Sequence, residues 1–223
     1  MIASDRKAKR VGTALLIVDG TDEVLNRKAV IALLPGRVRA RSLSKLVALS
    51  REVYNATIEH RRDAWRLAQV TVSRFDEFNE IPGLRGLRPD VAAFGNQFVR
   101  GSISRADEAF GAFFRRLGDG ETPGYPRFKP ERRFRTAFYD EPAGWALRRL
   151  GSDDPALYVQ GVGEIALSIR SVRQLQRFIG RGGEARTLTI TKSRSGAWRA
   201  CVGFRNVASS PLPVNDQVGG VDR

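Results

Sequence analysis

The sequence predicts an α+β fold in which a small antiparallel β-barrel is interrupted by a helical insertion. Short apolar segments rich in β-branched residues lie near the start of the chain and again in its last third. Between them, apolar residues recur at the spacing of amphipathic helices. Glycine and proline break the β segments into short strands joined by tight turns, a pattern typical of small barrels.

Two strands are expected before the helices. The first covers residues 11–18, where Val, Leu and Ile form an apolar run that ends at Asp19-Gly20. The second covers residues 29–34 and ends at Pro35-Gly36. Both runs have the length and the turn residues of short strands.

Two long amphipathic helices are expected next. The first begins after an N-cap at Ser42 and runs to about Val72. The second runs from Pro89 to Leu117 and ends at Gly118. Its phenylalanines can stack on bases, but their helical spacing favours packing in a core. These phenylalanines are Phe94, Phe98, Phe110, Phe113 and Phe114.

Residues 118–135 are predicted to form an extended segment, the basic strip. Its prolines are incompatible with a helix, and Glu131 is the single acid within residues 124–135. Cations interleaved with aromatic rings suit a sugar–phosphate backbone with stacked bases, although the same rings can anchor an exposed loop to the core. The cations are Arg127, Lys129, Arg132, Arg133 and Arg135, and the rings are Tyr125, Phe128 and Phe134.

Four further strands are expected after the basic strip, separated by glycine-containing turns. They cover residues 157–159, 164–169, 187–191 and 198–204. Lys192 and Arg194 lie at the tip of the hairpin between the last two strands. Their charges can reach a phosphate or can simply keep the turn soluble.

The charge of the chain indicates a polyanionic partner. It has 38 Lys and Arg against 24 Asp and Glu, a formal net charge of +14, and this excess is typical of nucleic-acid-binding proteins. An inert basic surface is the alternative. No apolar run approaches the roughly 20 residues that span a bilayer, so no membrane partner is expected. The start of the chain lacks the apolar core of a signal peptide, which predicts a cytoplasmic, nucleoid-associated protein of bacterial type.

The chain is poor in metal-binding and nucleophilic side chains. Cys201 is its one cysteine and His60 its one histidine, which excludes a disulfide or a Cys/His zinc site within the chain. Cys201 is expected in the core and His60 on a solvated helix face.

Six short motifs follow one another between residue 51 and residue 222. They are Arg51-Glu52-Val53-Tyr54-Asn55; Asn96-Gln97 followed by residues 107–115; Gly124-Tyr125-Pro126-Arg127-Phe128-Lys129 with Arg133-Phe134-Arg135; residues 157–163; residues 189–192 before 195–198; and Gly220-Val221-Asp222. In this order they resemble the amino-terminal half of the TnpB (OrfB) RNA-guided transposon nucleases and of their relatives, the miniature type V (Cas12-like) CRISPR effectors. Asn96 and Gln160-Gly161 depart from the family pattern and, with the longer amino-terminal segment, favour a CRISPR-associated relative.

The resemblance implies a domain order. An OB-like barrel, the wedge domain, would comprise residues 1–40 and, together with the basic strip, residues 123–210. A helical recognition domain would occupy residues 41–122. Residues 211–223 would form a linker and the first strand of a truncated RuvC-like RNase H fold.

The resemblance also implies nucleic-acid-binding residues. Tyr54 and Gln97 would lie near a motif adjacent to the DNA target, with Asn55 and Asn96 beside them, and Gln97 can bond an adenine edge through two hydrogen bonds. Tyr54 can equally be a core aromatic, and Gln97 an exposed helical residue. The remaining candidates would contact the nucleic acid chiefly through phosphates. They are Tyr125, Arg127, Lys129, Arg133, Arg135, Lys192 and Arg194.

The expected partners are a guide RNA, double-stranded target DNA and the RNA–DNA heteroduplex. Asp222 matches the first RuvC carboxylate, and the complete nuclease would use Mg²⁺ held by several carboxylates. The chain supplies one of these, so by itself it is expected to bind no metal and to leave DNA uncut. The alternatives are a nuclease-inactive RNA-guided DNA-binding regulator and a structural, ribosomal-type RNA-binding protein.

Overall fold

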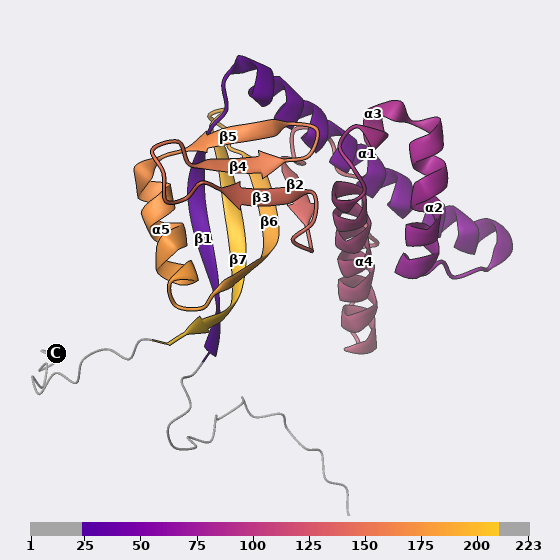
Figure 1. Cartoon of the computed structure of the whole chain (residues 1–223). Helices are drawn as coiled ribbons and strands as arrows, with labels where there is room; N and C mark the ends of the chain where they lie inside the picture. Colours follow the sequence, from indigo (N-terminus) through magenta and orange to yellow (C-terminus); the bar gives the residue numbers. More distant parts are fainter. Residues whose placement is uncertain (1–23, 210–223) are drawn as a thin grey trace, which may run out of the picture.

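The computed structural model describes residues 24–209 (Figure 1). The strand expected at residues 11–18, the linker at 211–217 and the motif at 220–222 lie outside these residues. Seven strands and five helices are described in an α+β arrangement. The strands are β1 (Val24–Leu34), β2 (Thr136–Tyr139), β3 (Trp145–Arg148), β4 (Ala156–Val159), β5 (Gly163–Leu167), β6 (Glu184–Lys192) and β7 (Trp198–Ala208).

The strands form one antiparallel sheet in the order β2-β6-β7-β1-β5-β4-β3. The long strand β1 connects its two halves: most of β1 pairs with β7, whereas its last residues, Leu33 and Leu34, pair with β5. The sheet curls so that β3, β4 and β5 cross in front of β1 and β7 (Figure 1). Side chains alternate across it, with Ala29 and Ile31 buried and Val30 exposed.

The expected antiparallel barrel interrupted by helices is confirmed in part, because the strands form one curled half-barrel sheet. β2 and β3 are its edges, and no strand pairing joins them within residues 24–209. Helix α4 packs along β2 instead, so closely that a Cβ at Gly101 would collide with the Phe138 carbonyl oxygen. A helix that covers a sheet edge protects that edge, as closure of a barrel would otherwise do.

The expected strands at 29–34, 157–159, 187–191 and 198–204 are confirmed within β1, β4, β6 and β7. The strand expected to reach residue 169 ends at Leu167, because the Ser168 hydroxyl accepts a hydrogen bond from the Ser171 N–H and starts helix α5 (Ile169–Ile179). Strands β2 and β3 and helix α5 were not anticipated from the sequence pattern.

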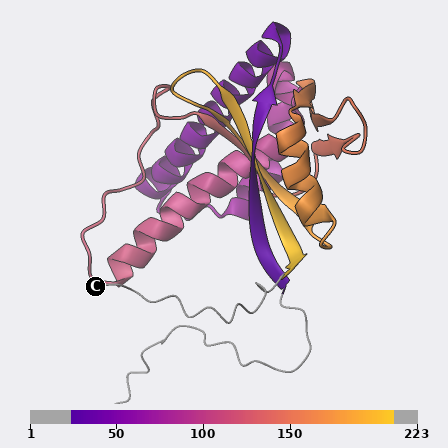
Figure 2. The same cartoon turned by 90° about the vertical axis from the view of Figure 1, so that its left-hand side faces the viewer.

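The helical layer consists of α1 (Arg37–Ala68), α2 (Arg74–Leu87), α3 (Pro89–Ala92) and α4 (Gln97–Gly118). Figure 2 shows α1 and α4 side by side behind the sheet. Ser42 is not the N-cap of the first helix. That helix begins at Arg37, directly after Pro35-Gly36, and the Ser42 hydroxyl donates to the Val38 carbonyl inside it. It ends before Val72, since Gln69 adopts the left-handed conformation.

The second expected helix is broken in the structure. Gly95 has a φ of 80°, and the side chain of Gln160 occupies the space that a Cβ at residue 95 would need, so α3 ends and α4 restarts at Gln97. Phe94, Phe98 and Phe110 lie in the core as expected, whereas Phe114 is exposed. Within residues 24–209, no helix has the length and apolar character needed to cross a bilayer.

Candidate nucleic-acid interface

The basic strip is attached to α1 by the side chain of Asn55. The Asn55 amide nitrogen donates to the Lys129 carbonyl at 3.2 Å, and the Lys129 N–H donates to the Asn55 Oδ1 at 2.8 Å. A side-chain amide that bonds both the N–H and the carbonyl of one residue holds that residue's backbone in place, as a neighbouring β-strand would. Asn55 therefore positions the basic strip, while the Lys129 side chain remains exposed.

A second attachment is the aromatic pair of Tyr54 and Phe134. Their ring centroids lie 5.7 Å apart, and both rings are buried. Tyr54 is 5% exposed, and this burial raises the pKa of its hydroxyl. The ring of Phe134 belongs to the core and supports the strip from below. Of the three strip aromatics, Phe134 thus acts as an anchor.

A third set of hydrogen bonds joins the end of the strip to the β6–β7 hairpin. The Lys192 N–H donates to the Arg135 carbonyl at 2.9 Å. The Arg135 guanidinium donates to the Ser193 carbonyl at 3.2 Å. Lys192 and Arg194, at the hairpin tip, are thereby brought beside strip cations that precede them by almost sixty residues.

A groove of about 680 Å³, called here the hairpin groove, lies between α1, the basic strip and the hairpin tip. Its lining residues include five cations and one carboxylate, Glu131. The ammonium of Lys192 lies 5.6 Å from the centre of the Trp198 ring, which holds that charge over an aromatic face. The five cations are Arg51, Arg132, Arg135, Lys192 and Arg194.

A second groove of about 630 Å³, the helix groove, lies on the other side of the strip, between it, α1 and α4. It also has five cations against one carboxylate, Glu108, and Tyr54 contributes to its lining. Pro130, Phe134 and Arg135 line both grooves and form the ridge between them. The cations of the helix groove are Arg105, Arg127, Lys129, Arg133 and Arg135.

Arg105 is a candidate that the sequence analysis missed. It projects from α4 into the helix groove, donates to the Thr136 hydroxyl and lies 5.0 Å from the centre of the Phe138 ring. Burial lowers the pKa of its guanidinium, and within residues 24–209 no carboxylate forms an ion pair with it. A partly desolvated cation without a paired anion is suited to binding a phosphate. In the sequence, the only sign of this role is that Arg105 lies close to the apolar face of the helix expected over residues 89–117.

Ion pairs in the described residues form away from the two grooves. Arg61 binds Glu77 at 2.6 Å and Asp107 at 2.8 Å, Arg88 binds Glu52, and Arg149 binds Glu164 at 2.7 Å. In the described part of the chain, the cations that line the grooves form no such pair with an acidic side chain. Their charge is therefore available to a ligand.

The other two strip aromatics are partly open to solvent, Tyr125 against α4 and Phe128 against Arg62 of α1. Tyr125 is 42% exposed and packs edge-on against Phe110 at 5.5 Å and Phe113 at 5.4 Å between ring centroids. Phe128 is 46% exposed, and the Arg62 guanidinium lies 5.2 Å from its ring centre. Each ring is fixed by a neighbour and keeps open surface on which a base can stack.

Gln97 and Asn96 are not brought together with Tyr54. Tyr54 shares the helix groove with Arg105 and Ala109, which lie eight and twelve residues beyond Gln97 along α4, or roughly 12 to 18 Å at the helical rise. The Oε1 atom of Gln97 is buried without a hydrogen-bond donor in the described structure, beside Gly144. Asn96 is exposed at the N-cap position and makes no side-chain cap.

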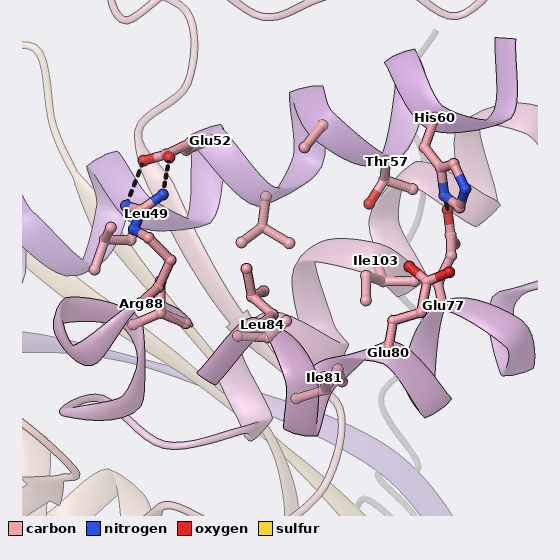
Figure 3. A pocket seen from close by; sticks show the side chains of 14 residues that line it. Leu49, Glu52, Thr57, His60, Glu77, Glu80, Ile81, Leu84, Arg88 and Ile103 are labelled. Atoms are coloured by element: carbon pink, nitrogen blue, oxygen red, sulfur yellow. Dashed lines mark hydrogen bonds and ion pairs between the residues drawn. The ribbon is translucent and has the colours of Figure 1, made fainter. Parts of the chain in front are cut away.

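A third cavity, of about 260 Å³, lies between α1, α2 and α4 (Figure 3). Its walls are apolar, including Leu49 and Ile81, and one end carries the ion pair of Arg88 and Glu52. At the other end, burial raises the pKa of Glu77, while its ion pair with Arg61 opposes that rise. Because its one arginine is already ion-paired and its other ionised lining residues are carboxylates, this cavity does not suit a phosphate backbone.

Two smaller expectations are settled by the side chains. His60 is partly exposed on α1, as expected, with Nδ1 3.8 Å from the Glu77 carboxylate. Cys201 is half-buried rather than fully in the core, because the adjacent residues of β7 alternate between the two faces of the sheet. Among residues 24–209, no three His, Cys, Asp or Glu side chains gather as a metal site would require, and Asp222 lies outside them.

No protein-family model matches the chain, and no curated protein matches it significantly. Among solved structures, it is similar to a chain in "Cryo-EM structure of CRISPR-Cas12f Ternary Complex", with a TM-score of 0.44, 11% identity, and coverage of 81% of this chain and 42% of that one. It is also similar to a chain in "Cryo-EM structure of the Cas12f1-sgRNA-target DNA complex", with a TM-score of 0.41, 10% identity, and coverage of 85% and 49%. The chain spans less than half of the length of either.

Proposed function

We propose that this chain is the nucleic-acid-binding portion of an RNA-guided DNA endonuclease similar to TnpB and the miniature type V effectors. The observation that carries the proposal is the convergence of strip, α1, α4 and hairpin cations on two grooves that each contain one carboxylate. The six motifs quoted from the sequence supply the family resemblance. In this proposal the two grooves hold guide RNA and the guide–target heteroduplex.

The grooves are suited to recognising backbone and shape. The basic strip is attached at Asn55, Phe134 and Arg135, so its cations are presented on a backbone that is already ordered. Ordering before binding lowers the entropy lost when a phosphate is contacted. Contacts of this kind position a nucleic acid without reading its sequence, and base pairing with the guide would supply the sequence specificity.

Reading of a target-adjacent motif is assigned to the start of α4. The half-buried Gln97 has no hydrogen-bond donor for its Oε1 in the described structure, so this oxygen can turn outward and, with the amide nitrogen, bond an adenine edge through two hydrogen bonds. Tyr54 would act differently, by holding Phe134 and the ridge in place, since it has almost no exposed surface. Asn96, exposed beside Gln97, is the accompanying polar contact.

Cleavage is assigned to the complete protein. Its RuvC-like part would begin at Gly220-Val221-Asp222 and would hold Mg²⁺ with Asp222 and further carboxylates. The described residues contain no cluster that fits the ion, so no catalytic step is assigned to them. Their proposed role is to bind and position the guide and the target.

The test is to purify the chain with its co-expressed RNA and to sequence that RNA. We expect one discrete guide-like RNA, and DNA binding that depends both on complementarity to it and on an adjacent motif. Ribosomal fragments, or binding without dependence on a motif, would instead support the structural RNA-binding alternative. Cleavage assayed on the complete protein with Mg²⁺ then separates a nuclease from a nuclease-inactive regulator.

A further inference from the structure

Helix α5 lies on the flank of the sheet opposite α2 and α4 (Figure 1), and its sequence contains a row of arginines. Its apolar face packs against the sheet through the buried residues Val172 and Leu175. Arg170, Arg173 and Arg177 are exposed. At about 100° per residue they fall within an arc of roughly 60° on the face opposite Val172 and Leu175. Arg181, also exposed, continues the row beyond the helix.

These arginines are not neutralised by neighbouring acids. Residues 169–179 contain no Asp or Glu, and within residues 24–209 none of the four arginines forms an ion pair. By contrast, Arg148 at the end of β3 and Arg149 directly after it are both paired with Glu164. A face that serves only solubility mixes both signs of charge.

The helix itself gains little from its cations. Arg170 lies in the first turn, where the helix dipole disfavours a positive charge, and no acidic residue occupies that turn. The arginines are spaced three or four residues apart, so like charges are adjacent along one face, which also disfavours the isolated helix. An anionic partner would remove both costs.

We propose that α5 is a second sugar–phosphate surface, which binds a double-helical segment while the two grooves hold another nucleic acid. The row from Arg170 to Arg181 advances by about 4.5 to 6 Å per step and spans roughly 16 Å. Phosphates of one strand advance by about 3.4 Å along the duplex axis and also turn about it, so about two or three of them lie close enough to face the row.

The chemistry of α5 favours a duplex over a single strand or a membrane. Single-stranded sites present exposed rings for base stacking, whereas Phe178 is half-buried and packs on Phe204 at 5.4 Å between ring centroids. A membrane-surface helix inserts a continuous apolar face into lipid, but the middle of the apolar face of α5, Val172 and Leu175, is covered by the sheet, and only Ile169 and Ile179 at its two ends are exposed. Because α5 and the grooves lie on different flanks, two segments can be held together by one chain. This bridging rests on the proposed function of the grooves, whereas binding at α5 does not.

The test uses the full chain and two probes of the same sequence, an RNA duplex and a DNA duplex of about 20 base pairs. One duplex is immobilised, the chain is added, and capture of a second, labelled duplex is measured. We expect the wild-type chain to capture it. The variant Arg173→Gln/Arg177→Gln, which keeps good helix formers on α5, should lose capture. The control Arg116→Gln/Arg148→Gln removes the same charge from arginines that are already ion-paired, and should capture normally.

Direct titration separates the two surfaces. In a chain with Arg127→Gln/Arg133→Gln, which weakens the helix groove, the α5 substitutions should still lower the slope of log affinity against log salt by about two. That result, even without a guide RNA, would support α5 independently of the proposed function. The RNA and DNA probes identify which duplex α5 prefers. Unchanged capture and slope in the α5 variant would overturn the inference, as would an effect confined to binding of phosphatidylserine vesicles.

Discussion

The side chain of Asn55 and the backbone of Lys129 exchange two hydrogen bonds, at 2.8 and 3.2 Å, across 74 residues of sequence. Asn55→Ala removes both bonds, each worth about 1 kcal/mol, and leaves the charge unchanged. We expect nucleic-acid affinity to fall by roughly tenfold, because the strip must then be ordered on binding, with the salt slope unaltered. Fluorescence anisotropy at several salt concentrations measures both. Asn79→Ala, at an exposed position of α2, is the control; a lower slope in Asn55→Ala would refute the positioning role.

Arg105 contributes a desolvated cation to the helix groove, so Arg105→Gln should weaken binding to all sequences and lower the salt slope by about one. Its removal should leave the melting temperature unchanged or raise it, since a partly buried unpaired charge is costly in the free protein. Arg116→Gln, exposed and paired with Glu121, is the matched control. An unchanged slope together with a large loss of stability would mean that Arg105 is structural.

Gln97→Ala should abolish the preference for a target-adjacent motif while leaving binding to non-specific DNA near the wild-type value. The reason is that a base-edge contact worth about 1 to 3 kcal/mol is lost and no phosphate contact is removed. Binding to a library of randomised flanking sequences measures the preference. Gln69→Ala, at the end of α1, is the control. Retention of the motif preference would exclude Gln97 from the reading site.

Two glycines of α4 should respond oppositely to alanine. Gly101→Ala forces a Cβ into the Phe138 carbonyl, so α4 must shift from β2, and we expect a loss of more than about 1 kcal/mol in the free energy of unfolding. Gly111→Ala has open space around its Cβ and should stabilise by up to about 1 kcal/mol through helix propensity. Urea denaturation tests both. Equal effects would contradict the close packing of α4 on β2.

The pH dependence of stability should include Glu164. The guanidinium groups of Arg149 and Arg148 lower its pKa to about 2, below the ordinary value of 4.5. A depressed carboxyl pKa stabilises the folded chain above pH 4.5, and that stabilisation is lost as the pH falls from 4.5 towards 2. Glu164→Gln should therefore flatten this part of the stability curve, followed by thermal denaturation. The control Glu59→Gln, on α1, should leave this part of the stability curve unchanged. Identical curves for wild type and Glu164→Gln would disprove the coupling.

The sequence was informative where local chemistry dominates. Proline and charge predicted an extended basic strip, and alternation predicted β7 and most of β6. Helix α2 was missed because Pro82, Gly83 and Gly86 weaken its pattern, although Ser73 and Asp76 form a complete capping box at its start. The pattern of strands predicted a curled antiparallel sheet but could not specify whether its two edges meet, and in the described residues the edge strands β2 and β3 do not pair.

The site was also predicted only in part, because its separate segments can be recognised from local sequence but their contacts cannot. Composition identified the strip cations and the hairpin tip as separate elements. Their meeting depends on contacts between distant segments, such as Arg135 with Ser193, which no local pattern encodes. Arg105 and the α5 row were invisible without the fold, because an isolated arginine on a helix is usually a solvated surface residue.

The pairing of β1 with β7 also has a consequence for biosynthesis. Val24 pairs with Ala208 and Leu33 with Trp198, so the centre of the sheet joins the earliest and the latest described strands. Such contacts between distant segments form slowly, whereas α1 to α4 make more local contacts. On the ribosome the helical layer can therefore pack first, while β1 waits for β7 to emerge. Until then its hydrogen-bonding edges are exposed, and this interval is when the nascent chain is most open to mispairing and to chaperones.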